Sequence, residues 1–512
     1  MEEFIQKHKG KVIGVLCGWD RLRFRGTLRI LSHAEGMMAY LNRAGVLLKN
    51  FGGFVEGKSD ELKAAIHARA KELGRPVVYL DSSRICKEEV ALDIAKRDEI
   101  KEGLVCVLSA VEPCLSYLVR WDPERKHLVL KRGVRKCLHL YGYVIDEVFG
   151  WMSIRIQTWF PFTVQVCMNG REWLARRMDK EGTLYERRDN CFAQISDLAK
   201  AQALMGKMNE LNWPSELERV VKALNPLQGG MLPEWPQQTY WSAQETEWAT
   251  DVMFRTAADL GAIYPALVRG AIQTFSSPDV MRFLGKKLVG QFHGELNSSY
   301  RQRPEGVRVK HRVKANSIKV YDKQGSVLRV ETTINDPGAF KVYRTKEGGC
   351  GGKKDWRVLR RGVADLHRRS VVSQAANDRY LNALAALDTN TPFGELLGSE
   401  CRPVKFHRQR YRGLRPWGDG DQDLLKAISR GEFALEGFRN KDLVRSLGLG
   451  DLDPKKASSR ISRLLRILRA HQLIRKIQGC HRYVATPKGR KIAAAILQLQ
   501  VATLQQIAKA AA

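Results

Sequence analysis

Three acidic residues stand where short apolar runs end, and carboxylates placed in this way can share a divalent metal. Asp20 follows the run 12–17, Glu112 follows 104–111 and Asp146 follows 138–145. A metal-dependent nuclease would use such a set. Acidic residues at strand ends are also common turn formers, and this ordinary role is the interpretation we favour.

A second group of reactive side chains lies in residues 317–331, which alternate as two strands around a glycine-containing loop. A three-residue loop at 324–326 puts Lys319 opposite Glu331 and Tyr321 opposite Arg329 on one face. The other face is apolar and consists of Ile318, Val320, Leu328 and Val330. The Lys319–Glu331 pair then has a structural explanation, a cross-strand ion pair that contributes roughly 0.2–1 kcal/mol.

The same stretch, Tyr321-Asp322-Lys323 followed by Leu328-Arg329-Val330-Glu331, is similar to a segment of replication-initiation proteins from rolling-circle plasmids and filamentous phages. The resemblance implies that Tyr321 is a catalytic nucleophile and that Asp322 and Glu331 are metal ligands, for Mg²⁺ or Mn²⁺. The paired-histidine motif of many such enzymes is missing here, since His311 stands alone. We therefore favour a structural hairpin, and whether the protein is an enzyme stays open.

The charge of the chain indicates a polyanionic partner. There are 86 Lys and Arg residues against 55 Asp and Glu, a formal net charge of +31. Residues 301–369 hold 19 Lys and Arg against 7 Asp and Glu, a net charge of +12. A compact particle tolerates such charge poorly without a polyanion. We expect the central nucleic-acid contacts to come from Arg308, Lys310, Arg312 and Lys314.

The last hundred residues predict three helices and a two-stranded ribbon. The helices are expected at 421–429, at 440–447 with Asn440 as N-cap and Gly448 as stop, and at 454–470. In the third helix an apolar stripe recurs at helical spacing, formed by Ile461, Leu464, Leu465 and Leu468. Residues 473–477 and 481–486 then alternate around a turn at 478–480. Basic side chains of the third helix are left free on the opposite side.

Residues 421–490 resemble a winged helix-turn-helix domain, on the pattern Arg463-Leu464-Leu465-Arg466, then 471–476, His481-Arg482-Tyr483 and Thr486-Pro487-Lys488-Gly489-Arg490. The resemblance implies that 454–470 enters the DNA major groove and that 477–483 is a wing on the backbone or minor groove. The DNA contacts expected are Lys455, Lys456, Ser459, Arg460, Arg463, Arg475, Lys476, His481 and Arg482. The terminal helix, with Leu497, Val501, Leu504 and Ala508 at helical spacing, could form a homodimer or close the local core.

Several function classes have no support in the sequence. No apolar run is long enough to cross a bilayer, and the ten cysteines have no zinc-ligand spacing. We expect reduced, buried thiols in a cytoplasmic protein without membrane contact. No phosphate-binding loop or dinucleotide fingerprint occurs, so no cofactor-binding site is expected. The aromatics at 159–162 could stack on bases, but we expect them in the core.

Together these features predict a multidomain α+β protein. We expect an N-terminal mixed α/β domain at 1–225, a central basic α+β domain with a β-hairpin at 237–350, a basic helical segment and linker at 351–417, and a winged helix with a terminal helix at 418–512. The favoured function is duplex-DNA binding by a protein of a mobile genetic element. The alternatives are a metal-dependent nicking replication initiator or nuclease, and a protein that binds structured RNA.

Overall fold

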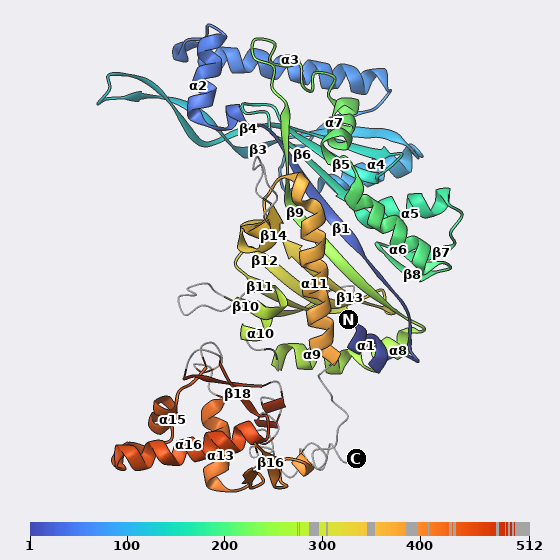
Figure 1. Ribbon diagram of the computed structural model, residues 1–512. Helices are drawn as coiled ribbons and strands as arrows, with labels where there is room; N and C mark the ends of the chain where they lie inside the picture. The colour runs from blue at the N-terminus through green and yellow to red at the C-terminus, as the bar shows by residue number, and fades with distance from the viewer. Residues whose placement is uncertain are drawn as a thin grey trace.

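The computed structural model describes residues 1–273, 277–285, 296–303, 306–345, 354–385, 397–407, 409–429, 437–477 and 481–486, with single residues between and beyond these ranges. Within them the chain has a mixed α+β fold built on one large sheet (Figure 1). None of the described helices combines the length and the apolar character needed to cross a bilayer.

The large sheet contains 11 strands among the described residues, in the order β10-β11-β12-β13-β9-β1-β6-β5-β4-β3-β2. Every pairing in it is antiparallel except that of β2 with β3, so the sheet is mixed. Its N-terminal strands are β1 (Val12–Leu28), β2 (Val77–Tyr79), β3 (Gly103–Asp122), β4 (His127–Asp146), β5 (Gly150–Gln157) and β6 (Val164–Asn169). The others are β9 (Thr239–Phe254), β10 (Leu296–Arg303), β11 (Gly306–Val313), β12 (Asn316–Lys323) and β13 (Val327–Ile334).

The centre of the sheet joins segments from both sides of the expected boundary at 225–237. β1 pairs with β9 from Val12↔Phe254 to Leu28↔Thr239, and β9 pairs in turn with β13. The sheet is therefore continuous across that boundary. The apolar run 12–17 is the first part of the longer strand β1, which stays in register with β9 by means of β-bulges.

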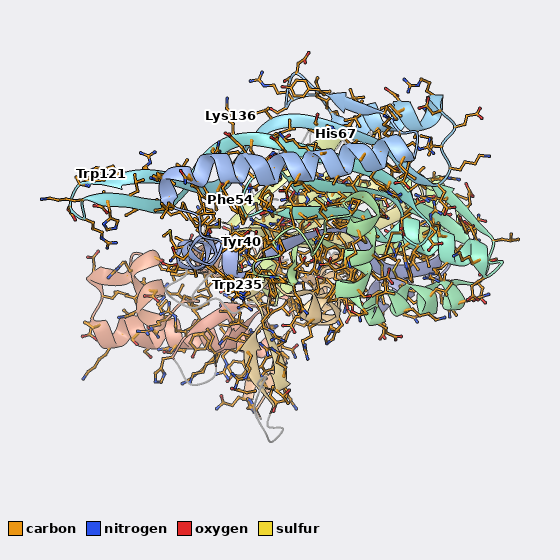
Figure 2. All side chains as sticks on the ribbon, turned by 90° about the horizontal axis from the view of Figure 1, so that it is seen from above. Tyr40, Phe54, His67, Trp121, Lys136 and Trp235 are labelled. Atoms are coloured by element: carbon orange, nitrogen blue, oxygen red, sulfur yellow. The ribbon has the colours of Figure 1, made fainter. Side chains whose placement is uncertain are left out.

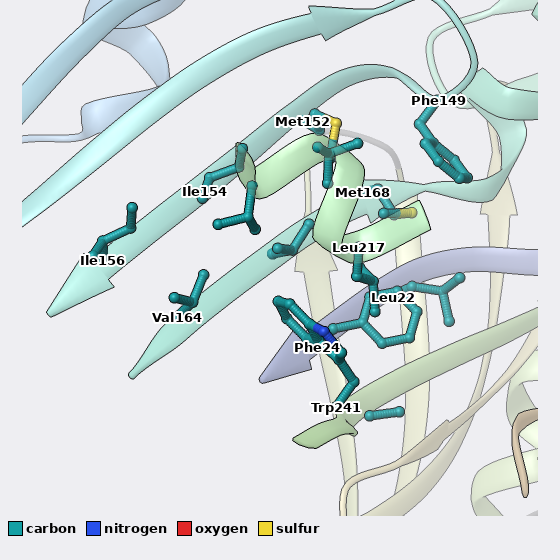
Figure 3. Packing of buried hydrophobic residues seen from close by; sticks show 14 of the residues in the cluster. Leu22, Phe24, Phe149, Met152, Ile154, Ile156, Val164, Met168, Leu217 and Trp241 are labelled. Carbon is teal, nitrogen blue, oxygen red and sulfur yellow. The ribbon is translucent and has the colours of Figure 1, made fainter. Parts of the chain in front are cut away.

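One face of the N-terminal half of the sheet carries the largest core. Side chains such as Leu22, Phe24 and Met168 alternate inward from β1 and β6 and meet Leu217 of α7 (Trp213–Leu224), as Figure 3 shows. Further helices that contribute to this core are α2 (Ala34–Arg43), α3 (Phe51–Glu72), α5 (Gly170–Lys180) and α6 (Leu198–Lys207). The opposite face carries α4 (Lys87–Arg97) over β3 and β4.

A second core lies under the other half of the sheet. The long helix α11 (Leu366–Ala385) packs along β9 and β13 with α1 (Glu2–Lys7), α8 (Ala257–Gly261), α9 (Tyr264–Gln273) and α10 (Ser277–Phe283) (Figure 1). All of these cover the face that carries Val309, Ile318, Val320 and Val330. The face that carries Lys310, Lys319 and Glu331 is the other one, because successive strand residues point to opposite sides.

Four two-stranded ribbons complete the described strands. They pair β7 (Tyr185–Arg188) with β8 (Cys191–Ile195), β14 (Lys341–Thr345) with β15 (Lys354–Val358), β16 (Val404–Phe406) with β17 (Gln409–Tyr411), and β18 (Ile474–Lys476) with β19 (Tyr483–Ala485). The hairpin of β3 and β4 extends beyond the core as a long arm, and Trp121 lies near its end (Figures 1 and 2). Trp121 is 60% exposed.

The strands β5 and β6 pair with each other and are joined by a turn. The aromatics of that turn, Trp159, Phe160 and Phe162, are buried, which confirms the prediction that they belong to the core. The described cysteines form no disulfide, but Cys86 and Cys401 are exposed rather than buried.

The C-terminal part contains α13 (Asp419–Ile428), α15 (Asn440–Ser446) and α16 (Pro454–Ala470), followed by the ribbon β18–β19. Asp453 caps α16 by accepting hydrogen bonds from the backbone N–H groups of Lys455 and Lys456. Asn440 does not cap α15 as expected. It is the first helical residue, and its side chain donates to the Ser458 carbonyl and the Ser462 hydroxyl instead. Gly448 follows α15 in the left-handed region at φ 64°. The expected turn at 478–480 and the terminal-helix positions 497, 501, 504 and 508 lie outside the described residues.

Candidate metal centre in the central sheet

Three carboxylates from three neighbouring strands meet on the face of the sheet opposite α11. They are Asp20 of β1, Glu247 of β9 and Glu331 of β13, and one oxygen of each lies within 4.8 Å of the others. All three residues are buried. Among the described residues, this is the group of acidic side chains whose geometry could hold a metal ion.

A β-bulge explains why Asp20 joins this cluster. β1 and β9 pair at Trp19↔Trp248 and again at Leu22↔Thr246, so two residues of β1 oppose the single residue Glu247. A bulge of this kind re-aims side chains that regular pairing would send to the other face. Asp20 and Arg21 are the two bulged residues. Arg21 pairs with Glu247, and Asp20 lies in one cluster with Glu247 and Glu331.

Basic side chains neutralise much of the cluster. Lys319 Nζ lies 2.5 Å from Glu331 Oε1 and 3.6 Å from Glu247 Oε1. Arg21 lies 3.0 Å from Glu247 Oε1, and Arg329 lies 3.2 Å from Asp20 Oδ2. The ion pair predicted between Lys319 and Glu331 is therefore confirmed, together with the hairpin register that predicted it.

The pKa values of Glu331, Asp20 and Lys319 are shifted by their surroundings. Burial and the nearby charge of Glu247 raise the pKa of Glu331 to about 7. Burial opposes ionisation of Asp20 as well, but Arg329 and Arg171 outweigh it and lower the pKa of Asp20. Burial also disfavours the charge of Lys319, yet Glu331 and Glu247 prevail and raise its pKa. Glu331 can therefore exchange a proton near neutral pH.

Tyr321 is in direct contact with that exchangeable group. Its hydroxyl donates a hydrogen bond of 2.9 Å to Glu331 Oε2. Burial and the charge of Glu331 raise the pKa of Tyr321 well above its ordinary value. The phenol is therefore neutral, and the carboxylate beside it is the acceptor for its proton.

Buried charged residues next to the cluster hold Asp20 in position. Arg329 is fully buried and binds Asp251 through Nε at 2.6 Å and Nη2 at 2.8 Å. Its Nη2 also donates to the Asn190 carbonyl next to β8 at 2.7 Å. Arg171 of α5 reaches the same Asp251 at 2.9 Å. Such bidentate pairing holds the guanidinium group, and with it Asp20, in one orientation.

The donor set suits a hard divalent cation, since carboxylate oxygens are the ligands that Mg²⁺, Mn²⁺ and Ca²⁺ favour. Ligands at 2.0–2.6 Å from an ion lie up to about twice that distance apart, which agrees with the 4.8 Å spread of the three oxygens. The Lys319 ammonium group, however, lies among the same carboxylates. A metal held by Glu247 and Glu331 would require this side chain to move away.

The structure separates several residues that the sequence grouped together. Asp322 does not join Glu331: its Oδ1 accepts from the backbone N–H of Gly325 within the hairpin turn. Glu112 pairs with Lys87 and Arg155, and Asp146 pairs with Arg219. Of the three acids at expected strand ends, Asp20 alone lies in the carboxylate cluster.

His311 lies on the other face of the sheet, under α11. Its ring nitrogens contact the Tyr380 hydroxyl at 3.0 Å and the Ser298 hydroxyl at 2.8 Å. Burial lowers the pKa of His311 to about 4, so the ring is neutral and structural.

The basic residues predicted in the central part fall into two groups. Arg308 and Lys310 are half-buried on the face of Tyr321 and Lys319, and pair with these residues across β11 and β12. Arg312 and Lys314 are exposed at the end of β11, where Arg312 Nε donates to the Lys314 carbonyl. Only the first group lies near the carboxylate cluster.

The basic residues predicted in the C-terminal part are mostly exposed. On α16 the exposed residues are Lys455, Lys456, Ser459, Arg460 and Arg463, while Ile461, Leu465 and Leu468 are buried. Arg475, Lys476 and His481 of the ribbon are exposed as well. Arg482 is half-buried and donates to the Gly437 carbonyl at 3.0 Å.

Glu247 is the site residue that sequence reasoning missed. Its signal is the spacing of Glu245, Glu247 and Asp251 within the otherwise uncharged run 239–254. Acidic residues two or four apart in a strand share one face, and they are depleted in ordinary strands.

Comparisons with protein-family models, curated proteins and solved structures gave no match to this chain.

Proposed function

We propose that the protein binds duplex DNA through α16 and the ribbon β18–β19. The observation that carries the proposal is the division of α16 into a buried apolar stripe and an exposed face with Lys456, Arg460 and Arg463. An arginine on a protruding helix can donate two hydrogen bonds to guanine in the major groove, which is wide enough to admit a helix.

The surrounding sequence supports the same interpretation. Residues 416–512 contain 18 Lys and Arg against 8 Asp and Glu, a net charge of +10. The resemblance of 421–490 to winged helices would make this part a separate DNA-reading domain that follows the large sheet in the chain. A protein of a mobile genetic element, which must find a DNA site, fits this organisation.

The test is binding of duplex DNA selected from a random pool by the full chain. Arg460→Ala and Arg463→Ala should each weaken binding to the selected site by roughly 1–3 kcal/mol if the two side chains read bases. Lys426→Ala removes a charge from an exposed position on α13, outside α16 and the ribbon, and serves as the control. Unchanged affinity in the Arg460/Arg463 double variant overturns the proposal. Competition with single-stranded DNA and RNA distinguishes the RNA-binding alternative.

A second candidate function, DNA nicking, is favoured by the contact between Tyr321 and Glu331. In such a step the Tyr321 oxygen forms a bond to phosphorus, its proton passes to Glu331, and the bond from phosphorus to the leaving sugar oxygen breaks. The leaving oxygen takes a proton from water. Asp20, Glu247 and Glu331 would hold the divalent cation that such chemistry uses.

The nicking candidate is tested by incubating the full chain with single-stranded and duplex DNA in Mg²⁺ or Mn²⁺. A covalent protein–DNA adduct that forms in the wild type and disappears in Tyr321→Phe supports it. An adduct that persists in Tyr321→Phe removes Tyr321 from the role of nucleophile.

A further inference from the structure

Two arginines beside the carboxylate cluster have no acidic partner. Arg23 and Arg25 alternate with the core residues Leu22 and Phe24, so they lie on the same face of the sheet as Arg21. Both are half-buried, and no ion pair of the described residues includes either. Glu245, which lies opposite Arg23 in β9, is bound at 2.8 Å by Arg21 instead.

The surroundings of Arg25 are also basic. Gln165 lies beside it on β6 and Arg155 lies beyond on β5, in register across the sheet. Burial and the charges of Arg132 and Arg155 lower the pKa of Arg25, whereas no acidic group offsets them. A half-buried guanidinium group in a positive field is stabilised by an anion.

The other side of the cluster repeats this pattern. Lys310 lies across from Lys319, and Arg308 lies across from Tyr321. Both are half-buried, and neither has an ion-pair partner among the described residues. Burial, Lys319 and Arg308 lower the pKa of Lys310 and outweigh the opposing charges of Glu247 and Glu331. The carboxylate cluster thus lies between two groups of basic side chains that have no ion-pair partner among the described residues.

We propose that this face of the sheet binds the backbone of a single DNA strand, with phosphates on Arg23 and Arg25 at one side of the cluster and on Lys310 and Arg308 at the other. Arg23 and Arg25 lie roughly 6.6 Å apart along β1. This interval is close to that of successive phosphates in an extended strand. A strand that runs from these residues to Lys310 and Arg308 crosses the part of the sheet that carries Tyr321 and Glu331.

This proposal rests on the proposed function, because the choice of DNA as the nucleic acid comes from the DNA binding proposed for α16. The single-strand proposal and the duplex proposal can fail separately. Single-strand binding on the sheet depends on Arg23 and Arg25, whereas binding of a selected duplex depends on Arg460 and Arg463.

The experiment measures the affinity of the full chain for a labelled 20-nucleotide single strand across a salt series. Each lost phosphate contact lowers the slope of log K against log salt by about 0.7 for single strands. Arg23→Gln with Arg25→Gln should therefore lower the slope by about 1.4 and weaken binding by about 25-fold at 0.1 M salt. Arg23→Lys with Arg25→Lys keeps both charges and should restore most of the slope.

Lys71→Gln with Lys222→Gln is the matched control, because it removes the same charge from exposed positions on α3 and α7, which pack on the opposite face. Its slope should equal that of the wild type. A wild-type slope in the Arg23/Arg25 glutamine variant, or an equal loss in the control, overturns the proposal. If the Arg23/Arg25 glutamine variant loses slope only with an oligoribonucleotide of the same sequence, the assignment to DNA is overturned. If the glutamine variant loses salt slope on the single strand but keeps its affinity for the selected duplex, the result supports two separate sites.

Discussion

Glu331 is held through both of its carboxylate oxygens by two residues of the neighbouring strand β12. Tyr321 donates to Oε2 at 2.9 Å, and Lys319 lies 2.5 Å from Oε1. Because Lys319 and Tyr321 are two residues apart in β12, they lie side by side on one face. A carboxyl group whose pKa is about 7 therefore has a neutral hydrogen-bond donor at one oxygen and a positive charge at the other.

Tyr321→Phe removes the donor to Glu331 without changing the shape of the ring. We expect the free energy of unfolding to fall by about 1–3 kcal/mol, the cost of leaving a buried acceptor without its partner. Urea denaturation at pH 8 measures this loss. The control is Tyr185→Phe. The Tyr185 hydroxyl donates to Asp179 at an exposed site, so its loss should change stability much less. A loss at Tyr321 no larger than that at Tyr185 contradicts the prediction.

Lys319→Met leaves two buried carboxylates, Glu247 and Glu331, without their shared ammonium group. Removing one partner of a buried ion pair typically costs about 3–5 kcal/mol. We expect a loss of this size at pH 8 and a smaller loss at pH 5.5, where Glu331 is protonated. Mn²⁺ should raise the Tm of this variant more than that of the wild type, because the ion can take the vacated position. Equal losses at the two pH values would contradict the assigned role of Glu331.

Glu331→Gln should change how stability depends on pH. A carboxyl group whose pKa is raised from 4.5 to about 7 on folding binds protons more tightly in the folded state. Its contribution to the free energy of unfolding therefore declines as pH rises from about 4.5 to about 7, and stays low above that range. The stability difference between wild type and variant should fall across pH 5–7 and then level off.

The matched control for this pH series is Glu112→Gln. Burial opposes ionisation of Glu112, but its hydrogen bonds with Tyr141 and Lys87 and the charge of Arg155 lower the pKa. Its contribution is therefore present above about pH 4.5 and is lost only below it. The wild-type-minus-variant difference should stay constant between pH 5.5 and 8. A decline in both series would mean that the effect does not come from Glu331.

Arg329→Lys keeps the charge but not the planar group that binds Asp251 through two nitrogens. We expect a loss of about 1–3 kcal/mol, because buried carboxylate oxygens of Asp251 or Asp20 are left without donors. Arg21→Lys is the comparison, since its side chain is 44% exposed and such pairs contribute about 0–1 kcal/mol. Thermal unfolding of both variants measures the two losses. A similarly small decrease in Tm for both variants contradicts the prediction.

The hairpin of β12 and β13 shows what local sequence pattern can predict. Alternation of apolar and polar residues and the glycine in the turn were sufficient to give the pairing Lys319↔Glu331 and Tyr321↔Arg329. These contacts connect residues near in sequence, so register and turn geometry determine them. The helix α16 was predicted at 454–470 with its apolar stripe, and the structure has it at Pro454–Ala470.

The carboxylate cluster could not be predicted in this way, because its members are brought together by pairing between distant strands. Asp20 meets Glu331 only because β9 lies between β1 and β13 and because a bulge shifts the register at Asp20. Nothing in residues 12–28 indicates the partner strand. The resemblance to replication-initiation proteins implied Asp322 as a metal ligand, but Asp322 is next to Tyr321 in β12, and neighbours in a strand point to opposite faces.

The pairing of β1 with β9 also has a consequence for synthesis of the chain. β1 is complete by residue 28, but its partner on one side extends from 239 to 254. Until that segment leaves the ribosome, β1 presents a long unpaired edge, which is a template for intermolecular association. A fragment that stops at residue 236 should therefore aggregate, and supplying residues 237–385 in trans should keep it in solution.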